Sequence, residues 1–311
     1  MKIVVLDDYQ RVARRYASFE SLGEVEVLHE HLASPVELAA ALRGADVVVA
    51  MRERTPFTDF SDFPDIKLLV TTGMANASIN LEAATAAGVT VCGTTGSGVS
   101  TAELTWALIL ACRRNVVAED RALREGRWQT TVGFDLAGST LGVLGVGRLG
   151  SQVARIGRAF DMRVIAWSQN LTAERAADAG ATLVTKDELL AYADVLSIHL
   201  KLSARTAGLI GAAELAAMKP SAILVNTSRG PIVDETALAT ALTTGAIAGA
   251  GLDVFDVEPL PLGNPLRGAP HTVLTPHLGY VTDATYRGWY QQIVEDIAAW
   301  QAGAPIRVLT P

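Results

Sequence analysis

The chain contains only two cysteines in 311 residues, Cys92 and Cys112, and neither has the spacing of a metal ligand. Two isolated thiols cannot build the disulfide framework on which small secreted domains depend. The first ten residues also lack the long apolar stretch of a signal peptide. We therefore expect a reduced, cytoplasmic protein, and we predict no metal site.

Long apolar runs and an excess of basic charge are missing as well. No stretch approaches the roughly 20 apolar residues that a membrane-spanning helix requires. Asp and Glu outnumber Lys and Arg by 33 to 26, which gives a net charge of −7. Proteins that bind nucleic acids need clustered basic charge to replace the phosphate counterions. We expect neither a membrane nor a nucleic acid as a partner.

What the chain has in quantity is hydrophobic residues, which make up 50% of it against 19% charged residues. This composition is typical of a globular protein, and 311 residues exceed the usual size of one hydrophobic core. We predict two domains: residues 1–97 plus 284–311, and residues 98–283. The small polar segment Thr94-Thr95-Gly96-Ser97-Gly98 is the hinge candidate between them.

Apolar runs of strand length alternate with helical patterns along both domains. In the first domain the predicted strands are residues 2–8, 25–29, 46–50, 66–72 and 89–93. Such alternation favours a parallel sheet in an α/β fold, and it continues in the second domain up to residue 276. One long helix is expected at residues 101–125. The amphipathic pattern at residues 283–302 predicts a last helix that packs back on the first domain.

The stretch on which the second domain depends is Thr140-Leu-Gly-Val-Leu-Gly-Val-Gly-Arg-Leu-Gly150. It reads as a strand, a glycine turn and the start of a helix, and a second strand follows at residues 163–167. In this context Gly145 permits the tight turn, Gly147 lets the backbone approach a pyrophosphate, and Gly150 lets the helix pack on the strand. The N–H groups at the helix start then favour an anion. The pattern predicts a dinucleotide site.

Three loops that follow later strands carry unusual residues for such positions. Arg229 directly follows an apolar strand, and its planar guanidinium suits a carboxylate. Glu258 and His277 lie in the next two loops. If they meet, the carboxylate orients the imidazole and favours its protonated form. An arginine for an acid, a histidine for a proton and a nicotinamide for hydride form a set suited to reduction of a 2-oxo acid.

At this point the runs 145–150, 226–230, 251–259 and 275–279 resemble those of the D-isomer-specific 2-hydroxyacid dehydrogenase family, in the same order and spacing. The resemblance implies a Rossmann dinucleotide-binding domain inserted in a smaller, flavodoxin-like substrate domain, both with doubly wound parallel sheets. The active site would lie in the cleft between them. Arg229 would clamp the substrate, Glu258 would pair with His277, and His277 would donate the proton.

The resemblance also implies how a cofactor is held. Arg148 and Leu149 would cover the pyrophosphate, and Asp253 would hold the nicotinamide carboxamide. Residues that would line the cofactor cleft are His199, Leu200 and Thr227, although His199 is equally compatible with a packing role.

In the first domain, backbone N–H groups of Gly73, Met74 and Ala75 would hold the substrate carboxylate. Family members often have Gly-x-Gly followed by aspartate there, whereas this chain has Gly73-Met74-Ala75-Asn76. The departure affects substrate placement. Arg52, near the predicted cleft, is a candidate for a distal acidic group of the substrate, and a solvated loop position is the alternative.

Ser168 stands where an aspartate normally binds the 2′-hydroxyl of the cofactor's ribose, about 20 residues beyond the glycines. We expect both NAD and NADP to be accepted, with a slight lean to NADP, because no carboxylate repels a 2′-phosphate and no adjacent cation attracts it. Arg175 is expected to belong to the next helix. We also expect a homodimer. The alternative function is a dinucleotide-sensing regulatory protein of the same fold without turnover.

Overall fold

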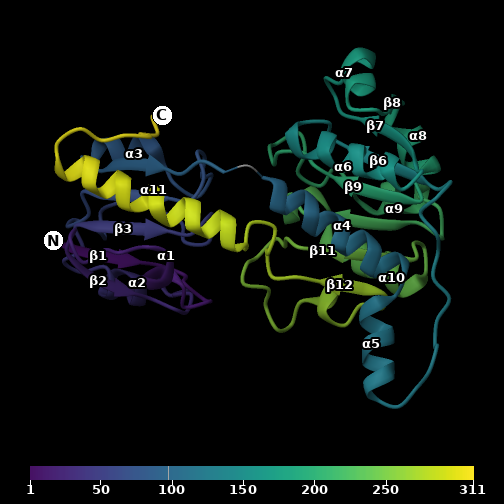
Figure 1. The fold of residues 1–311 in the computed structure, drawn as a ribbon, viewed down its shortest axis with the longest axis horizontal. Coiled ribbons are helices and arrows are strands. Elements are labelled where there is room, and N and C mark those ends of the chain that lie inside the picture. The colour runs from purple at the N-terminus through teal and green to yellow at the C-terminus, as the bar shows by residue number, and fades with distance from the viewer. Residues whose placement is uncertain (97) are drawn as a thin grey trace. The chain divides into compact units, whose positions relative to one another are not determined.

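The computed structural model describes residues 1–96 and 98–311, which form two compact units (Figure 1). The first comprises Met1–Ser97 with Thr282–Pro311, and the second comprises Gly98–Val281. Part of the predicted hinge, Ser97, lies outside the described residues. No helix in the described part combines the length and apolar character needed to cross a membrane. The two units are described separately below.

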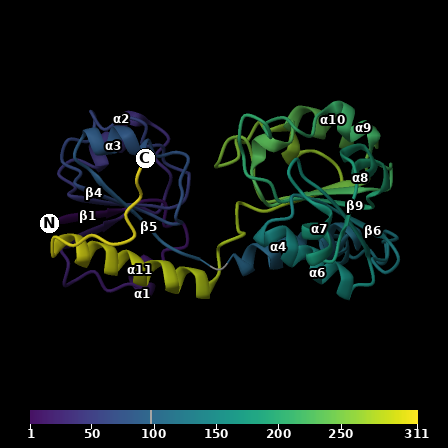
Figure 2. The same cartoon turned by 90° about the horizontal axis from the view of Figure 1, so that it is seen from above.

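The first unit contains a five-stranded parallel sheet in the order β2-β1-β3-β4-β5. Its helices α2 and α3 cover one face, and α1 and α11 cover the other (Figure 2). This strand order is that of the flavodoxin-like doubly wound fold. The strands are β1 (Lys2–Val5), β2 (Glu24–Val27), β3 (Val47–Ala50), β4 (Leu68–Thr71) and β5 (Thr90–Gly93), and the helices are α1 (Ala13–Tyr16), α2 (Pro35–Ala41), α3 (Leu81–Ala86) and α11 (Asp283–Gln301).

The second unit contains a seven-stranded parallel sheet in the order β12-β11-β10-β9-β6-β7-β8. Strand order reverses between β6 and β9, and in open α/β sheets a ligand binds at such a switch point. The strands are β6 (Thr140–Leu144), β7 (Arg163–Trp167), β8 (Thr182–Leu183), β9 (Val195–Ile198), β10 (Ile223–Asn226), β11 (Gly249–Leu252) and β12 (Thr272–Leu274). The helices are α4 (Val99–Arg113), α5 (Val116–Arg124), α6 (Arg148–Ala159), α7 (Ala173–Asp178), α8 (Lys186–Tyr192), α9 (Ala212–Ala217) and α10 (Glu235–Thr244).

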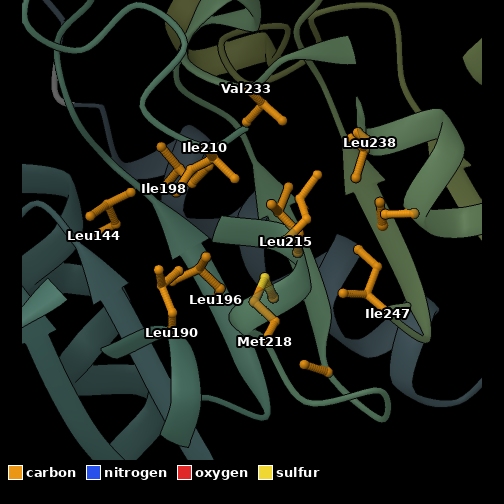
Figure 3. Close-up of a cluster of buried hydrophobic side chains, with 14 of the residues drawn as sticks. Leu144, Leu190, Leu196, Ile198, Ile210, Leu215, Met218, Val233, Leu238 and Ile247 are labelled. Atoms are coloured by element: carbon orange, nitrogen blue, oxygen red, sulfur yellow. The ribbon is translucent and has the colours of Figure 1, made fainter. Parts of the chain in front are cut away.

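Two buried clusters hold the sheet of the second unit, one on each face. Figure 3 shows the cluster formed with α8, α9 and α10, in which Leu190, Leu215 and Leu238 pack on strand residues such as Leu196. The other cluster joins α4, α6 and α7 to the opposite face. Because both faces are covered, the inner strands β6, β9, β10 and β11 are buried along their whole length and are mostly apolar. The α/β fold class with two parallel sheets is confirmed.

The prediction of a single long helix at residues 101–125 is wrong. The structure has two helices, α4 and α5, with Asn115 between them at φ +51°. A left-handed residue cannot continue a right-handed helix, and asparagine adopts that conformation more readily than most residues. Neither glycine nor proline marks this break in the sequence, and apolar residues resume at Val116, so periodicity alone did not reveal it.

Candidate active site

The glycine turn of the second unit lies between β6 and α6, at the switch point of the sheet. Gly145 has φ +102°, and a side chain there would also collide with the carbonyl oxygen of His199, 2.8 Å from the Cβ position. A Cβ on Gly150 would lie 2.0 Å from the carbonyl oxygen of Gly145. Only glycine therefore allows β6, the turn and α6 to approach this closely.

The start of α6 fits a dinucleotide phosphate. Gly147 is the N-cap, no side chain caps the helix, and no atom lies within 4 Å of the place where a Cβ would stand. The first N–H groups of a helix need acceptors from outside it, and the helix dipole favours an anion at this end. The open glycine, with the uncapped helix start behind it, gives a pyrophosphate room to approach the backbone.

The residues predicted to line the cofactor cleft surround this turn. Leu200 packs its Cδ2 atom 2.8 Å from the Cβ position of Gly145, and the backbone of His199 lies against the same glycine. The His199 ring bonds Ser197 Oγ through Nε2, at 2.8 Å. Burial lowers the pKa of His199 to about 4, so its imidazole is neutral at physiological pH. It is therefore unsuited to supply a proton there.

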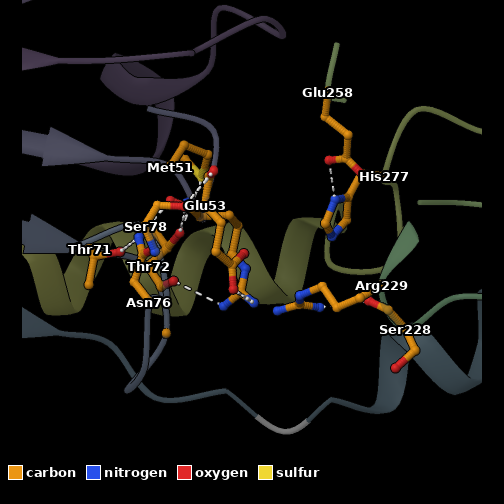
Figure 4. Close-up of polar contacts among 12 residues, drawn as sticks. Met51, Glu53, Thr71, Thr72, Asn76, Ser78, Ser228, Arg229, Glu258 and His277 are labelled. Carbon is orange, nitrogen blue, oxygen red and sulfur yellow. Dashed lines mark hydrogen bonds and ion pairs between the residues drawn. The ribbon is translucent and has the colours of Figure 1, made fainter. Parts of the chain in front are cut away.

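Arg229 follows β10 in a loop that its neighbours hold in place. The amide of Asn226 donates to the carbonyl of Arg229 at 2.9 Å, and Ser228 Oγ donates to the carbonyl of Leu200. Arg229 Nη1 donates to the carbonyl of Ser228 at 2.7 Å (Figure 4). A Cβ on Gly230 would lie 2.0 Å from the carbonyl carbon of Phe255, so the loop that carries Arg229 packs directly on the loop that leads to Glu258.

Glu258 and His277 meet, as the resemblance to the family implied. Glu258 Oε2 lies 2.6 Å from His277 Nδ1 (Figure 4), while Oε1 accepts the N–H of Phe255 at 3.0 Å. Both side chains are largely buried, with 20% and 12% exposed. His277 Nε2 has no hydrogen-bond partner within the described ranges. A carboxylate that accepts from Nδ1 orients the ring and leaves Nε2 to face a reactant.

Asp253 holds the loop that carries His277. Its Oδ1 accepts from Thr275 Oγ1 and from the N–H of Leu278, each at 2.6 Å, and its Oδ2 accepts from the N–H of Gly279 at 2.9 Å. Burial raises the pKa of Asp253, and these hydrogen bonds oppose that rise. His277 itself has φ +55°, a conformation that needs such support. A bond to a nicotinamide carboxamide remains a prediction for Asp253.

The predicted substrate loop of the first unit follows β4. Gly73 has φ +103°, and its N–H donates to Thr94 Oγ1 at 2.9 Å. No protein acceptor faces the N–H groups of Met74 and Ala75 in the part of the chain that the structure describes. Three residues were expected to hold a carboxylate through their backbone N–H groups. The N–H groups of Met74 and Ala75 remain available for this, whereas the N–H of Gly73 is already bonded to Thr94.

Arg52 is packed on this loop. Its Nη1 donates to the carbonyl of Thr72 at 3.1 Å, its Nη2 lies 3.2 Å from Glu53 Oε1, and its side chain is 18% exposed. Asn76 stands where the family often has aspartate, and its amide donates to the carbonyl of Arg52 at 2.7 Å (Figure 4). A carboxylate could not make that donation, so the departure from the family pattern serves the local conformation of the loop.

Comparison with known proteins agrees with this geometry. Residues 106–279 match the model of the D-isomer specific 2-hydroxyacid dehydrogenase family, NAD binding domain. The chain is 40% identical over 292 residues to a glyoxylate reductase of Aeropyrum pernix, covering 90% of this chain and 87% of that protein. The chain belongs to the D-isomer specific 2-hydroxyacid dehydrogenase family.

Two further relatives define the extent of the likeness. A crystal structure of a phosphoglycerate oxidoreductase from Vibrio cholerae superimposes with a TM-score of 0.93 at 35% identity, covering 98% of this chain and all of that one. A D-3-phosphoglycerate dehydrogenase of Archaeoglobus fulgidus is 38% identical over 246 residues, but the match covers 78% of this chain and 47% of that protein. The chain thus spans about half of that longer relative.

This D-2-hydroxyacid dehydrogenase is an NAD-dependent oxidoreductase that acts on the CH–OH group of 2-hydroxy acids. Its Rossmann unit is the NAD-binding domain of the family. The regulatory, non-enzymatic alternative is therefore not retained. The roles of the individual site residues remain predictions that rest on the geometry above.

Three contributors to the site were not anticipated from the sequence. The ring of Tyr280 lies 5.5 Å from the imidazole of His277, edge to face. Thr105 of α4 bonds the predicted cofactor residue Thr227 through their hydroxyls at 2.8 Å, and both are buried. Thr94 Oγ1 accepts a hydrogen bond from the N–H of Gly73. Tyr280 was detectable, since it directly follows the His277 motif, whereas the two threonines come from distant parts of the chain.

Proposed function

We propose that this enzyme interconverts a small 2-oxo acid, such as glyoxylate or hydroxypyruvate, and the corresponding D-2-hydroxy acid. The observation that carries the proposal is the 2.6 Å contact between Glu258 and His277 Nδ1, which presents Nε2 as the proton donor. A bound nicotinamide supplies the hydride that C2 of the oxo acid accepts. His277 Nε2 gives its proton to the carbonyl oxygen, and the product is the alcohol.

Within the second unit, Arg229 is proposed to bind the substrate acid. Arg229 offers a charged donor fork to the carboxylate and the carbonyl oxygen, which orients the acid and stabilises negative charge on that oxygen. Within the first unit, the N–H groups of Met74 and Ala75 are proposed as donors to a substrate carboxylate. Arg148, Leu149, Thr227 and Asp253 are proposed as cofactor contacts in addition to the three glycines.

The preference for a small substrate rests on Arg52. Its guanidinium is paired with Glu53, so the side chain that would face a distal phosphate carries a compensating negative charge beside it. A guanidinium that is already paired with a carboxylate attracts a second anion weakly. We therefore place glyoxylate and hydroxypyruvate ahead of phosphohydroxypyruvate.

Steady-state reduction of these three acids at one ionic strength tests the proposal. We expect kcat/KM for glyoxylate or hydroxypyruvate to exceed that for phosphohydroxypyruvate by at least about tenfold, the equivalent of roughly 1.4 kcal/mol. Both NADH and NADPH should serve, with a slight lean to NADPH. A preference for the phosphorylated acid would overturn the substrate class, and absence of turnover with all three would overturn the mechanism.

We also propose that two copies of the chain associate through α5 and the segment that follows it. In Figure 1 these project from the rest of the second unit. Trp128 is 76% exposed and Val132 is 91% exposed, and Leu123 lies in the same groove as Trp128. Contiguous exposed apolar side chains mark interaction surfaces. A single mass near 33 kDa by light scattering would contradict a homodimer. The cytoplasmic location also remains a prediction.

A further inference from the structure

A groove runs along the second unit between α6 and α7, starting at the glycine turn. Its volume is about 400 Å³. One end is formed by Val146 and Gly147, and the other by Gly180. The groove therefore adjoins the place where the dinucleotide phosphate is expected, and it extends away from it along the outer side of α6.

The groove is rich in positive charge. Arg155 and Arg158 reach it from α6 and Arg175 from α7, while Asp178 is the acidic side chain among the lining residues. Ser151, Arg155 and Arg158 share one face of α6, because residues three and four positions apart lie on the same side of a helix. Within residues 1–96 and 98–311, none of these three arginines forms an ion pair with a carboxylate. Their charge is available to an anion from outside.

The chain brings Arg175 to this groove through a short connection. Only residues 168–172 separate β7 from α7, and the N–H of Leu171 closes a turn onto the carbonyl of Ser168 at 3.0 Å. Thr172 caps α7, and Leu171 is buried. Arg175 does lie in the next helix, as expected, but its Nη2 reaches back to 3.5 Å from the carbonyl of Val146, inside the glycine turn.

We propose that this groove is the subsite for the 2′-phosphate of NADP(H), with Arg175 as the cation that binds it. The inference rests on the proposed function and deepens its cofactor preference. The 2′-position of the ribose is read at the residue after β7, which is Ser168 and not a carboxylate. Arg175 supplies the charge that residues 168–170 lack, and charge-assisted hydrogen bonds to phosphate are the strong ones. Arg155 adds longer-range attraction from α6.

Calorimetry with fragments of the cofactor tests the groove without turnover. In the wild type, 2′,5′-ADP should bind about ten- to hundredfold more tightly than 5′-AMP, because only the former carries the 2′-phosphate. Arg175→Ala should remove most of that ratio and leave 5′-AMP unaffected. Arg163→Ala is the matched control, since Arg163 is an exposed arginine at the amino end of β7, the end of the strand away from Ser168, and does not line the groove.

Three results would overturn the proposal: equal affinity of the wild type for both fragments, an unchanged ratio in Arg175→Ala, or an equal loss of the ratio in Arg163→Ala. Inorganic phosphate is the remaining probe. If it binds as tightly as 2′,5′-ADP and competes with it, the groove is a general anion site and not a cofactor subsite.

Kinetics separates this inference from the proposed function. Arg175→Ala should raise the KM for NADPH about ten- to hundredfold, with the KM for NADH and kcat unchanged. An enzyme that reduces 2-oxo acids with NADH but rejects NADPH would keep the proposed reaction and refute the subsite. An enzyme that binds 2′,5′-ADP through Arg175 but reduces no 2-oxo acid would do the reverse.

Discussion

The two units begin with the same elements, a central parallel strand followed by a turn and a helix, but the helix starts differ in charge. In the first unit, Asp8 Oδ1 accepts from the N–H of Val12 at 2.9 Å and Oδ2 from that of Ala13 at 3.1 Å, at the start of α1. In the second unit, no side chain caps α6 at Gly147. A helix start that the chain fills with its own carboxylate cannot take a phosphate, whereas one flanked by glycines can.

Each unit also contains a histidine paired with a carboxylate. His31 Nδ1 lies 3.0 Å from Asp7 Oδ1, and Asp7 Oδ2 accepts from Thr55. His277 Nδ1 lies 2.6 Å from Glu258 Oε2, in the unit that carries the glycine turn. A histidine–carboxylate pair therefore does not by itself assign chemistry, and the proposal for His277 rests on its place after β12, at the carboxyl edge of that sheet.

The largest expected effect separates these two histidines. His277→Ala should lower kcat for a 2-oxo acid by about 100- to 10,000-fold, because a general acid is lost. Cofactor binding should persist, since His277 is not part of the glycine turn. His31→Ala should leave kcat within a few-fold. Stopped-flow reduction and cofactor titration measure both, and wild-type turnover in His277→Ala would refute the assignment.

Next come two helical glycines, one in each unit. Gly150→Ala should abolish cofactor binding and destabilise the second unit by about 1–3 kcal/mol or more, because its Cβ would collide with the carbonyl of Gly145. Gly288→Ala in α11, where nothing lies within 4 Å of the Cβ position, should instead stabilise by about 0.5–1 kcal/mol. Urea unfolding measures the change in the free energy of unfolding for each variant. If both variants were stabilised, or both destabilised, the contrast between the two glycines would be refuted.

A buried histidine gives the second unit a stability that acid removes. Burial lowers the pKa of His199 to about 4, below its ordinary value of about 6.5. The unfolded chain therefore binds more protons, and the stabilising contribution is lost as pH falls from about 6.5 towards 4. The free energy of unfolding of wild type relative to His199→Asn should decline over that range. A difference independent of pH would contradict the burial argument.

The first unit contains a buried acid with the opposite slope. Burial raises the pKa of Asp296 to about 6, while its partner Arg307, 2.9 Å away, opposes the rise. Here the folded chain binds more protons than the unfolded chain. The contribution of Asp296 to the free energy of unfolding is therefore present below about pH 4 and is lost as pH rises through about 6. Relative to Asp296→Asn, wild type should lose stability as pH rises over this range. A gain instead would mean that the Arg307 ion pair outweighs burial.

The last contrast concerns the hydrogen bonds that Asp8 accepts at the start of α1. Asp8→Ala should cost about 1 kcal/mol, in the range of lost helix caps, because two N–H groups lose their acceptor. The KM values for NADH and NADPH should not change, since this helix start binds no cofactor. Denaturant unfolding with parallel kinetics tests both statements, and a shift in either KM would show that the two helix starts are not independent.

Much of this molecule follows from short stretches of sequence. Both parallel sheets and the glycine turn were predicted, because each depends on periodicity or on a short local motif. The meeting of Glu258 with His277 was expected only from the resemblance to the family. The break at Asn115 was missed, since its cause is a single left-handed backbone conformation that neither glycine nor proline marks in the sequence. The roles of Thr94 and Thr105 were missed because their partners are distant in the chain.

The sequence by itself determined which elements form, in what order, and which side chains follow each strand. Local propensity and spacing are sufficient for that. Only the tertiary structure decided which polar atoms remain available: Thr94 uses the donor of Gly73, Asp253 is engaged by the His277 loop, Glu53 pairs with Arg52, and Arg175 returns to the glycine turn. Such assignments depend on distances between atoms of separate segments, and hydrogen bonds and ion pairs weaken within about an ångström of their best geometry.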